Sequence, residues 1–293
     1  MRWDDSHESP DLIDRRGEGP ARAGGNLGGL LFLLPWLLRS PFGWIIVVGG
    51  VVYYVARSMG FVGGAADPSR VRGGTLSPTA ASSEASEVHF VSFVLDDVQA
   101  TWEQALPRTG HPYRHAKLVL YTDATQTGCG FGDAATGPFY CPVDERVYID
   151  LGFFRELAGK LGARGQFAQA YVIGHEIGHH VQKLLGISQR VAGMRSTAGA
   201  TGASVRLELQ ADCFAGMWAR STEKRALLES GDIGSALSAA AAVGDDRLQR
   251  TATGTVSPES WTHGSSEERV RWFGRGYDSS SIDACNTFSA TTL

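Results

Sequence analysis

The sequence predicts an α+β protein with a small N-terminal sheet, a mainly helical C-terminal part and a transmembrane helix ahead of both. Three features of the 293-residue chain carry this prediction. Short strand-like runs lie between positions 88 and 151, and long apolar segments with helical spacing follow from position 166. A separate apolar run covers positions 42–56, upstream of both. Strand and helix patterns are therefore segregated along the chain, which is typical of α+β folds.

Composition divides the chain into four segments. Residues 1–27 mix Asp, Glu and Arg with few apolar side chains, which predicts a disordered N-terminal tail. Residues 28–59 predict a membrane anchor, because the apolar run and its flanks approach the roughly 17–25 residues that a spanning helix needs. Residues 60–86, rich in Gly, Ala and Ser, predict a flexible linker. Residues 87–293 then form the folded domain, and the Leu-rich stretch 30–38 leaves an interfacial or re-entrant hairpin open.

Charge and cysteine usage predict the orientation of this anchor. More arginines precede the apolar run than follow it closely, which favours a cytoplasmic N-terminus. We therefore expect a single-pass membrane protein whose folded domain is periplasmic or extracellular. The four cysteines all lie in that domain, an even number that suits an oxidising compartment. They allow three connectivities. Cys129 and Cys141 flank a Gly-rich loop and are the favoured pair, which leaves Cys213 for Cys285.

Within the folded domain the patterns predict the following elements. Strands are expected at 88–94, 117–121 and 146–151, and helices at 96–106, 153–161, 166–185, 206–218 and 233–250. A last helix is expected after Ser265, because Ser265 and Glu268 have the spacing of a capping box.

The helix at 166–185 carries the motif that decides the chemistry. Residues 175–180 read His-Glu-Ile-Gly-His-His, whose first five positions match H-E-x-x-H. His175 and His179 are one helical turn apart, so both imidazoles can bind one metal ion at about 2.0–2.1 Å. Glu176 can take a proton from a metal-activated water and pass it to a leaving amine. The alternative is an ordinary core helix, but buried histidines and a glutamate are costly unless a metal satisfies them.

A catalytic zinc ion needs a third protein ligand and one open position. The metzincin pattern needs a further histidine at a fixed spacing and is excluded, because position 182 is Gln and position 185 is Leu. Glu208 and Asp212 lie one turn apart on a second apolar helix. This spacing suits Glu208 as the third ligand, with Asp212 accepting the second ring N–H of a ligating histidine. The alternative is an acidic pair facing solvent, which the surrounding apolar residues disfavour.

Several blocks of the sequence, in order, resemble the neutral zinc metallopeptidases of bacteria. They are residues 129–132, 137–142, 174–182, 206–216 and 263–273, and the resemblance runs from about residue 88 to the C-terminus. It implies a zincin-like fold and a gluzincin-like site that binds Zn²⁺ through His175, His179 and Glu208, with Glu176 as catalytic acid/base. It also suggests His263 as the group that stabilises the oxyanion, although a histidine that merely borders a helix is the alternative.

These observations predict a membrane-anchored zinc-dependent peptidase, an endopeptidase that hydrolyses peptide bonds with a metal-activated water. Its partners would be a protein or peptide substrate and the membrane. The net charge of −4 offers no electrostatic footprint for nucleic acid. The alternative function is a membrane-anchored interaction or chaperone-like protein in which zinc is only structural. The two hypotheses differ in whether the function of the protein requires the carboxylate of Glu176.

Overall fold

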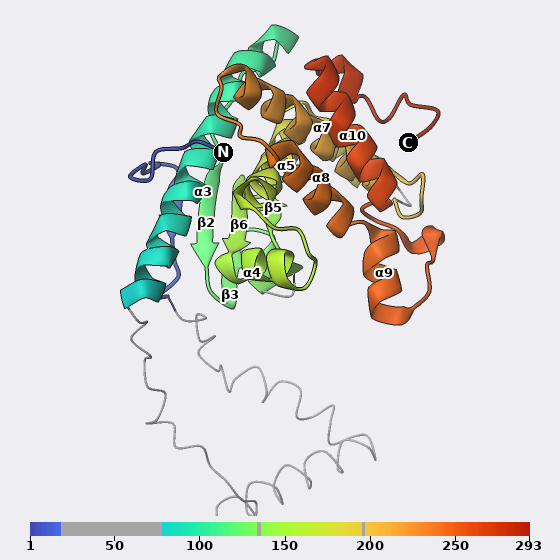
Figure 1. Ribbon diagram of the computed structural model, residues 1–293. Coiled ribbons are helices and arrows are strands. Elements are labelled where there is room, and N and C mark those ends of the chain that lie inside the picture. The colour runs from blue at the N-terminus through green and yellow to red at the C-terminus, as the bar shows by residue number, and fades with distance from the viewer. Residues whose placement is uncertain (19–77, 134–135, 195–196) are drawn as a thin grey trace, which may run out of the picture. The chain divides into compact units, whose positions relative to one another are not determined.

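The computed structural model describes residues 1–18, 78–133, 136–194 and 197–293, and these residues form a mixed α+β fold (Figure 1). A sheet of four strands has the order β1-β2-β6-β5. β1, β2 and β6 are parallel, and β5 runs antiparallel to β6 at one edge. β3 and β4 form a separate antiparallel hairpin. The strands span Leu12–Asp14 (β1), Lys117–Tyr121 (β2), Ala124–Thr127 (β3), Gly130–Asp133 (β4), Phe139–Cys141 (β5) and Arg146–Asp150 (β6).

Helices make up most of the remaining described chain. α5, α7, α8 and α10 pack against one another in one group, while α3 runs alongside β2 (Figure 1). The helix predicted at 166–185 is confirmed as α5, and Ser265 caps α10 through the predicted capping box with Glu268. The helices span Pro78–Ala105 (α3), Leu151–Gly159 (α4), Gln166–Leu184 (α5), Ile187–Ala192 (α6), Ala203–Lys224 (α7), Asp232–Ala242 (α8), Asp245–Thr253 (α9) and Ser266–Ser279 (α10).

α7 and α10 are in close contact because glycines face the partner backbone. A Cβ atom at Gly276 would overlap the carbonyl oxygen of Cys213, and one at Gly216 would overlap that of Phe273. A disulfide between Cys213 and Cys285 ties α7 to the chain that follows α10. The other favoured pair, Cys129 with Cys141, is also bonded. The C-terminal helices are therefore held together by backbone contact and a covalent bond.

Two of the predicted elements are wrong. Residues 88–94 are not a strand but part of α3, and residues 78–86 of the predicted linker are its first turns. The alternation that predicts a strand covers only seven residues. The buried side chains Phe90, Val94, Val98 and Trp102 recur every four residues, which is helical spacing. The helix expected at 233–250 is two helices, α8 and α9, because the chain turns at Gly244, where a Cβ would overlap the backbone of Ser266.

The N-terminal tail differs from the prediction of disorder over residues 1–18. β1 pairs with β2 in parallel, with Leu12 opposite Leu118. Met1 is buried, and the ring of Trp3 packs edge-on against Phe90. Three-residue strands carry no periodicity, and this one is stabilised by a partner about a hundred residues away in the sequence, so local composition does not reveal it.

The predicted single-pass membrane localisation is contradicted. Among the described residues, none of the helices has both the length and the apolar character needed to cross a membrane. The predicted anchor at 28–59, including the stretch 30–38, lies outside the described residues. Its uninterrupted apolar run, at 42–56, is shorter than the roughly 17–25 residues a spanning helix requires, and this is the physical weakness of the prediction.

Candidate metal centre

The H-E-x-x-H motif lies in the middle of α5, where the helix is buried on nearly all sides. His175 and Glu176 are each only 6% exposed. α7 approaches this part of α5 closely because position 178 is glycine. A Cβ there would come within 3.0 Å of the carbonyl oxygen of Ala211. The contact places the acidic residues of α7 directly against the histidines of α5.

Two histidines and a carboxylate converge at this contact. Glu208 Oε2 lies 3.1 Å from His175 Nε2, and Glu208 Oε1 lies 3.4 Å from His179 Nε2. All three donor atoms lie within 4.8 Å of one another. Ligand atoms around a tetrahedral zinc ion are separated by about 3.3 Å when the bonds are about 2.0–2.1 Å long. The spacing and the chemistry of these residues therefore fit a metal ion.

The outer ring nitrogens of both histidines are already hydrogen-bonded. His175 Nδ1 donates to Asp212 Oδ1 over 2.8 Å, and His179 Nδ1 donates to Gln182 Oε1 over 2.9 Å. Gln182 is oriented by its own amide, whose Nε2 donates to the carbonyl of Leu207 over 2.6 Å. Each imidazole therefore turns an unprotonated Nε2 toward Glu208 when it is neutral, which is the tautomer that binds a metal.

A buried ion pair lies behind His175. Asp212 is fully buried, and the guanidinium of Arg269 from α10 donates to both of its carboxylate oxygens, over 2.8 Å from Nε and 3.0 Å from Nη2. Tyr171 donates its hydroxyl to Asp212 Oδ1 over 2.5 Å and accepts from Arg269 Nη2 over 3.1 Å. Asp212 thus contacts His175, one of the candidate ligands, on one side and a buried cation on the other.

Electrostatics agree with a cation-binding role for this group. Burial alone would lower the pKa of His175, but the charge and hydrogen bond of Asp212 outweigh it and raise the pKa to about 10. Burial would raise the pKa of Glu208, yet the two histidines hold it well below its usual value. Burial raises the pKa of Glu176. The carboxylates of Asp212 and Glu208 thus favour a positive charge at His175, and a metal ion bound there would take the place of the proton.

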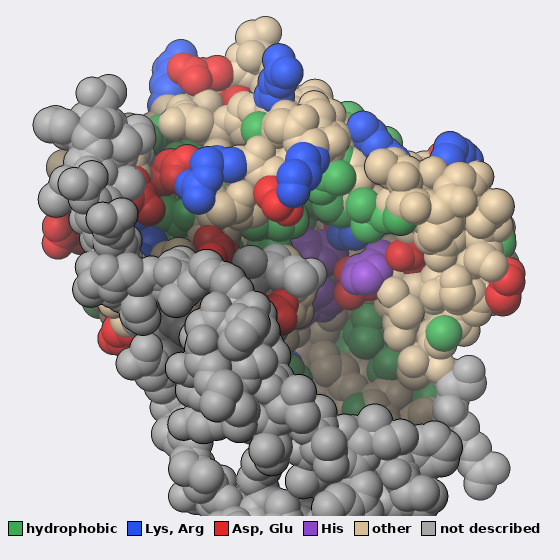
Figure 2. Space-filling view, turned by 90° about the horizontal axis from the view of Figure 1, so that it is seen from below, with side chains coloured by type: hydrophobic (Ala, Val, Ile, Leu, Met, Phe, Trp, Pro, Cys, Tyr) green, Lys and Arg blue, Asp and Glu red, His purple; other side chains and the backbone are tan. Residues whose placement is uncertain are grey.

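The centre opens into a cleft of about 610 Å³. Figure 2 looks onto a hollow face of the molecule where histidine and acidic side chains are visible among hydrophobic ones. His175, Glu176, His179 and Glu208 all line the cleft, and residues of β5 form part of its wall. Apolar side chains complete it: Phe153, Val172, Leu207, Val243 and Leu248. The cleft therefore offers a largely apolar surface next to the metal-binding group.

His263 also lines the cleft, on the chain between α9 and α10. Its Nδ1 lies 3.2 Å from Asp245 Oδ1, and Asp245 Oδ2 accepts the backbone N–H groups of Thr262, His263 and Gly264. This hydrogen bond to Asp245 outweighs burial and raises the pKa of His263. The structure therefore places the predicted residue in the same cleft, held by an aspartate at the start of α9.

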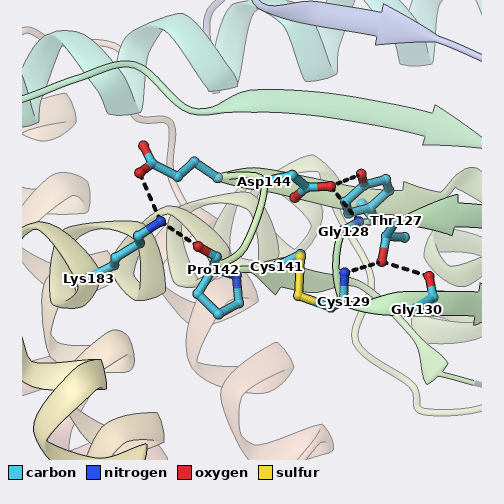
Figure 3. The surroundings of a disulfide bond; sticks show 10 residues. Thr127, Gly128, Cys129, Gly130, Cys141, Pro142, Asp144 and Lys183 are labelled. Carbon is cyan, nitrogen blue, oxygen red and sulfur yellow. Dashed lines mark hydrogen bonds and ion pairs between the residues drawn. A yellow bond between two sulfur atoms is a disulfide. The ribbon is translucent and has the colours of Figure 1, made fainter.

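A disulfide-bonded loop supports β5, whose residues form part of the wall of the cleft. Cys129 in the turn between β3 and β4 is bonded to Cys141 at the end of β5 (Figure 3). The next residue, Pro142, accepts a hydrogen bond from Lys183 of α5, and Lys183 also pairs with Glu145 over 2.8 Å. The loop is thereby attached to the helix that carries His175 and His179.

Sequence reasoning missed three residues of this site: Tyr171, Gln182 and Arg269. The sequence does contain a signal for Arg269, which is its spacing from the apolar residues of α10. Arg269, Trp272, Phe273 and Gly276 are the buried residues of this helix and lie on a single face. An arginine on the apolar face of a helix needs a buried partner. His180, next to the motif, points elsewhere and is held by the hydroxyl of Tyr140 and the carbonyl of Arg114.

The fold is α+β, and its candidate metal site joins the H-E-x-x-H helix α5 to a glutamate on α7. Both features are typical of H-E-x-x-H metalloproteins. A family model described as "Putative neutral zinc metallopeptidase" matches residues 1–288, and the chain belongs to that family. The resemblance noted from the sequence is therefore confirmed, and it extends to the N-terminal residues.

Relatives of similar length occur in bacteria. The chain is 44% identical to the uncharacterized protein YpfJ of Escherichia coli K12 over 293 residues, which cover 98% of this chain and 99% of that protein. It is 45% identical over 209 residues to the uncharacterized protein Mb2605 of Mycobacterium bovis, covering 68% of this chain and 69% of the other. No solved structure matches the chain significantly.

Proposed function

We propose that the protein is a zinc-dependent peptidase that cleaves internal peptide bonds of an extended polypeptide. The observation that carries the proposal is the convergence of His175, His179 and Glu208 within 4.8 Å of one another, beside Glu176 and at the floor of an open cleft. His175 and His179 would hold Zn²⁺ through Nε2, and Glu208 through its carboxylate. Membership of the neutral zinc metallopeptidase family supports this choice of metal and reaction.

When bound, zinc would polarise the scissile carbonyl and make a water acidic enough to lose a proton near neutral pH. Glu176 then has a defined task. Its carboxylate, 6% exposed and lining the cleft, accepts the proton of the attacking water and returns it to the leaving amine. The raised pKa of Glu176, caused by burial, suits a group that must both take up and release a proton.

Two further residues have supporting tasks in this proposal. Asp212 keeps the N–H of His175 on Nδ1, which leaves Nε2 free for the metal. His263 has its Nδ1 bound to Asp245, so the protonated ring offers its Nε2–H to the oxyanion that develops on the scissile carbonyl. In the same proposal, an extended peptide pairs with the main chain of β5, which is an edge strand of the four-stranded sheet within the described residues and lines the cleft.

The experiment that tests the proposal compares the parent chain with Glu176→Gln. The substitution keeps the shape of the side chain and removes its basicity. We expect zinc to be retained and cleavage of unfolded casein, followed by mass spectrometry of the fragments, to fall at least about a hundredfold. Equal cleavage by both proteins would contradict the role given to Glu176. No cleavage by a zinc-loaded parent would contradict the proposal and favour a protein in which zinc is structural.

A further inference from the structure

We infer that Arg269 is a positioning residue of the metal centre: through Asp212 it fixes the orientation of His175, so that α10 forms part of the zinc site without supplying a ligand. The inference rests on the zinc site proposed above but not on proteolysis. The observation behind it is that Asp212 contacts Arg269 as well as His175. The placement of the three candidate ligands does not by itself require the contact with Arg269.

The first step concerns the orientation of the Asp212 carboxylate. Oδ2 accepts from Arg269 Nε, and Oδ1 accepts from His175 Nδ1, Tyr171 and Arg269 Nη2. A guanidinium binds a carboxylate through two parallel N–H groups, and this fork fixes the plane of the carboxylate as well as its position. Without the fork, Oδ1 could rotate away from His175, and the imidazole would lose the acceptor that sets its tautomer.

The second step concerns charge. Asp212 is fully buried, and the side chain of Arg269 is only 4% exposed. A buried carboxylate without a partner is costly, and it would turn toward water instead of accepting from His175. Arg269 Nη2 lies 3.3 Å from His175 Nδ1, so the cation stands directly behind the ligand. The cation therefore keeps Asp212 available as an anionic acceptor at that place.

The third step separates positioning from simple attachment of α10. The helix is held to α7 without Arg269, because Gly216 and Gly276 allow backbone contact and Cys213 is bonded to Cys285. Trp272 and Phe273 of α10 are also buried in the core. The fold therefore has independent means of docking α10, and the fork of Arg269 is specific to the carboxylate behind His175.

The test uses the purified full-length chain and three variants: Arg269→Met, Arg269→Lys and, as the matched control on the same helix, Arg275→Met. Arg275 stacks over Trp272 with its guanidinium carbon 4.8 Å from the ring centre and does not line the cleft. Each protein is stripped of metal, checked for folding by circular dichroism, and titrated with Zn²⁺ against a chelator. The visible spectrum of the Co²⁺-loaded protein reports the geometry of the ligands.

We expect Arg269→Met to bind zinc about 10–100-fold more weakly than the parent and to show an altered cobalt spectrum, as is usual when a residue behind a ligand is removed. Arg275→Met should match the parent in both. Arg269→Lys keeps the charge but not the fork, so it should fold even if Arg269→Met does not. Its zinc affinity should also fall, and its cobalt spectrum should differ from that of the parent.

Folded Arg269 variants with parental zinc affinity and cobalt spectrum would overturn the inference and leave Arg269 a structural residue. A lower unfolding temperature with an unchanged cobalt spectrum would lead to the same conclusion. If the parent itself binds neither Zn²⁺ nor Co²⁺, the proposed function fails first. The two failures are therefore distinguishable.

Discussion

At the scale of single residues, the candidate ligands and Asp212 could be predicted from the sequence, whereas the roles of Tyr171, Gln182 and Arg269 could not. His175, His179 and Glu208 follow from helical spacing, because the motif and the later Glu-x-x-x-Asp pair each repeat once per turn. Arg269 and Tyr171 contact Asp212 only through tertiary packing, from α10 and from the preceding turn of α5. No local pattern links Arg269 to Asp212, so the spacing on α10 could reveal that Arg269 is buried but not what it binds.

Substitution of His263 by Gln should slow turnover of casein and change its pH dependence. If the protonated ring stabilises the oxyanion, we expect kcat to fall about 10²–10³-fold with little change in KM. The pKa of His263 is raised by its hydrogen bond to Asp245, so the ring is protonated below that raised value. Activity of the parent should therefore decline as the pH rises through it.

The measurement is kcat for the parent and for His263→Gln between pH 5 and pH 10. The variant should lack the decline on the alkaline side that belongs to His263. His7→Gln is a suitable control, since His7 contacts Asp96 and lies outside the cleft. An alkaline limb that survives in His263→Gln at parental rate would remove His263 from the mechanism.

At the scale of elements, the long apolar pattern at 166–185 predicted a helix correctly, whereas the short pattern at 88–94 predicted a strand wrongly. The twenty-residue pattern at 166–185 gave α5 because many turns repeat the same spacing. The seven residues at 88–94 fit a strand as well as they fit a helix. Only the buried face of α3, which continues over four or more turns, shows that they are helical. The break between α8 and α9 depends on the contact of Gly244 with Ser266, which is tertiary and thus absent from local sequence.

The close contact between α7 and α10 predicts that alanine substitution has opposite effects at two glycines of α10. Gly276→Ala would place a Cβ against the carbonyl oxygen of Cys213, so we expect it to destabilise the fold by at least about 1–3 kcal/mol. Gly274→Ala meets no atom within 4 Å and should stabilise it by about 0.5–1 kcal/mol. Chemical denaturation of both variants measures the difference, and equal effects would contradict the close approach.

At the scale of the whole molecule, the N-terminal residues belong to the same compact unit as the metal centre. Residues 1–18 cluster with the chain from Ser82 onward. Asp11 fixes the segment, since it is 6% exposed and accepts from Lys117 Nζ over 2.6 Å and Gln99 Nε2 over 2.9 Å. His115 also binds Asp11 through Nδ1, and Glu103 through Nε2 over 2.7 Å. An ordered N-terminus joined to β2 was invisible to composition because its partners are remote in sequence.

This cluster predicts how the docking of β1 depends on pH. Burial would raise the pKa of Asp11, but its hydrogen bonds to Lys117 and His115 outweigh that and lower it. Its contribution is therefore present above the unfolded value near about 3.9 and is lost as the pH falls through the folded pKa. Burial would lower the pKa of His115, but Asp11 and Glu103 raise it. The contribution of His115 is thus complete below about 6.5 and is lost as the pH rises through the folded pKa.

Hydrogen exchange of the β1 amides should accordingly be slowest at pH 4–6.5 after correction for intrinsic rates, and faster on either side. Asp11→Ala should remove most of this protection at a cost of about 1–3 kcal/mol, because Gln99 and Lys117 lose a buried acceptor. Asp5→Ala, a change at an exposed aspartate of the same N-terminal segment, serves as the control. Protection of β1 that is unchanged in Asp11→Ala would show that backbone pairing alone holds the segment.

The central claim is that three side chains from two helices hold one zinc ion. The most direct measurement is the metal content of the purified full-length chain, compared with His175→Ala and Glu208→Ala after each is shown to be folded. We predict one zinc ion per chain in the parent and none in either variant, since a site with two of its three ligands loses most of its affinity. A folded parent without zinc, or zinc retained in Glu208→Ala, would contradict the account.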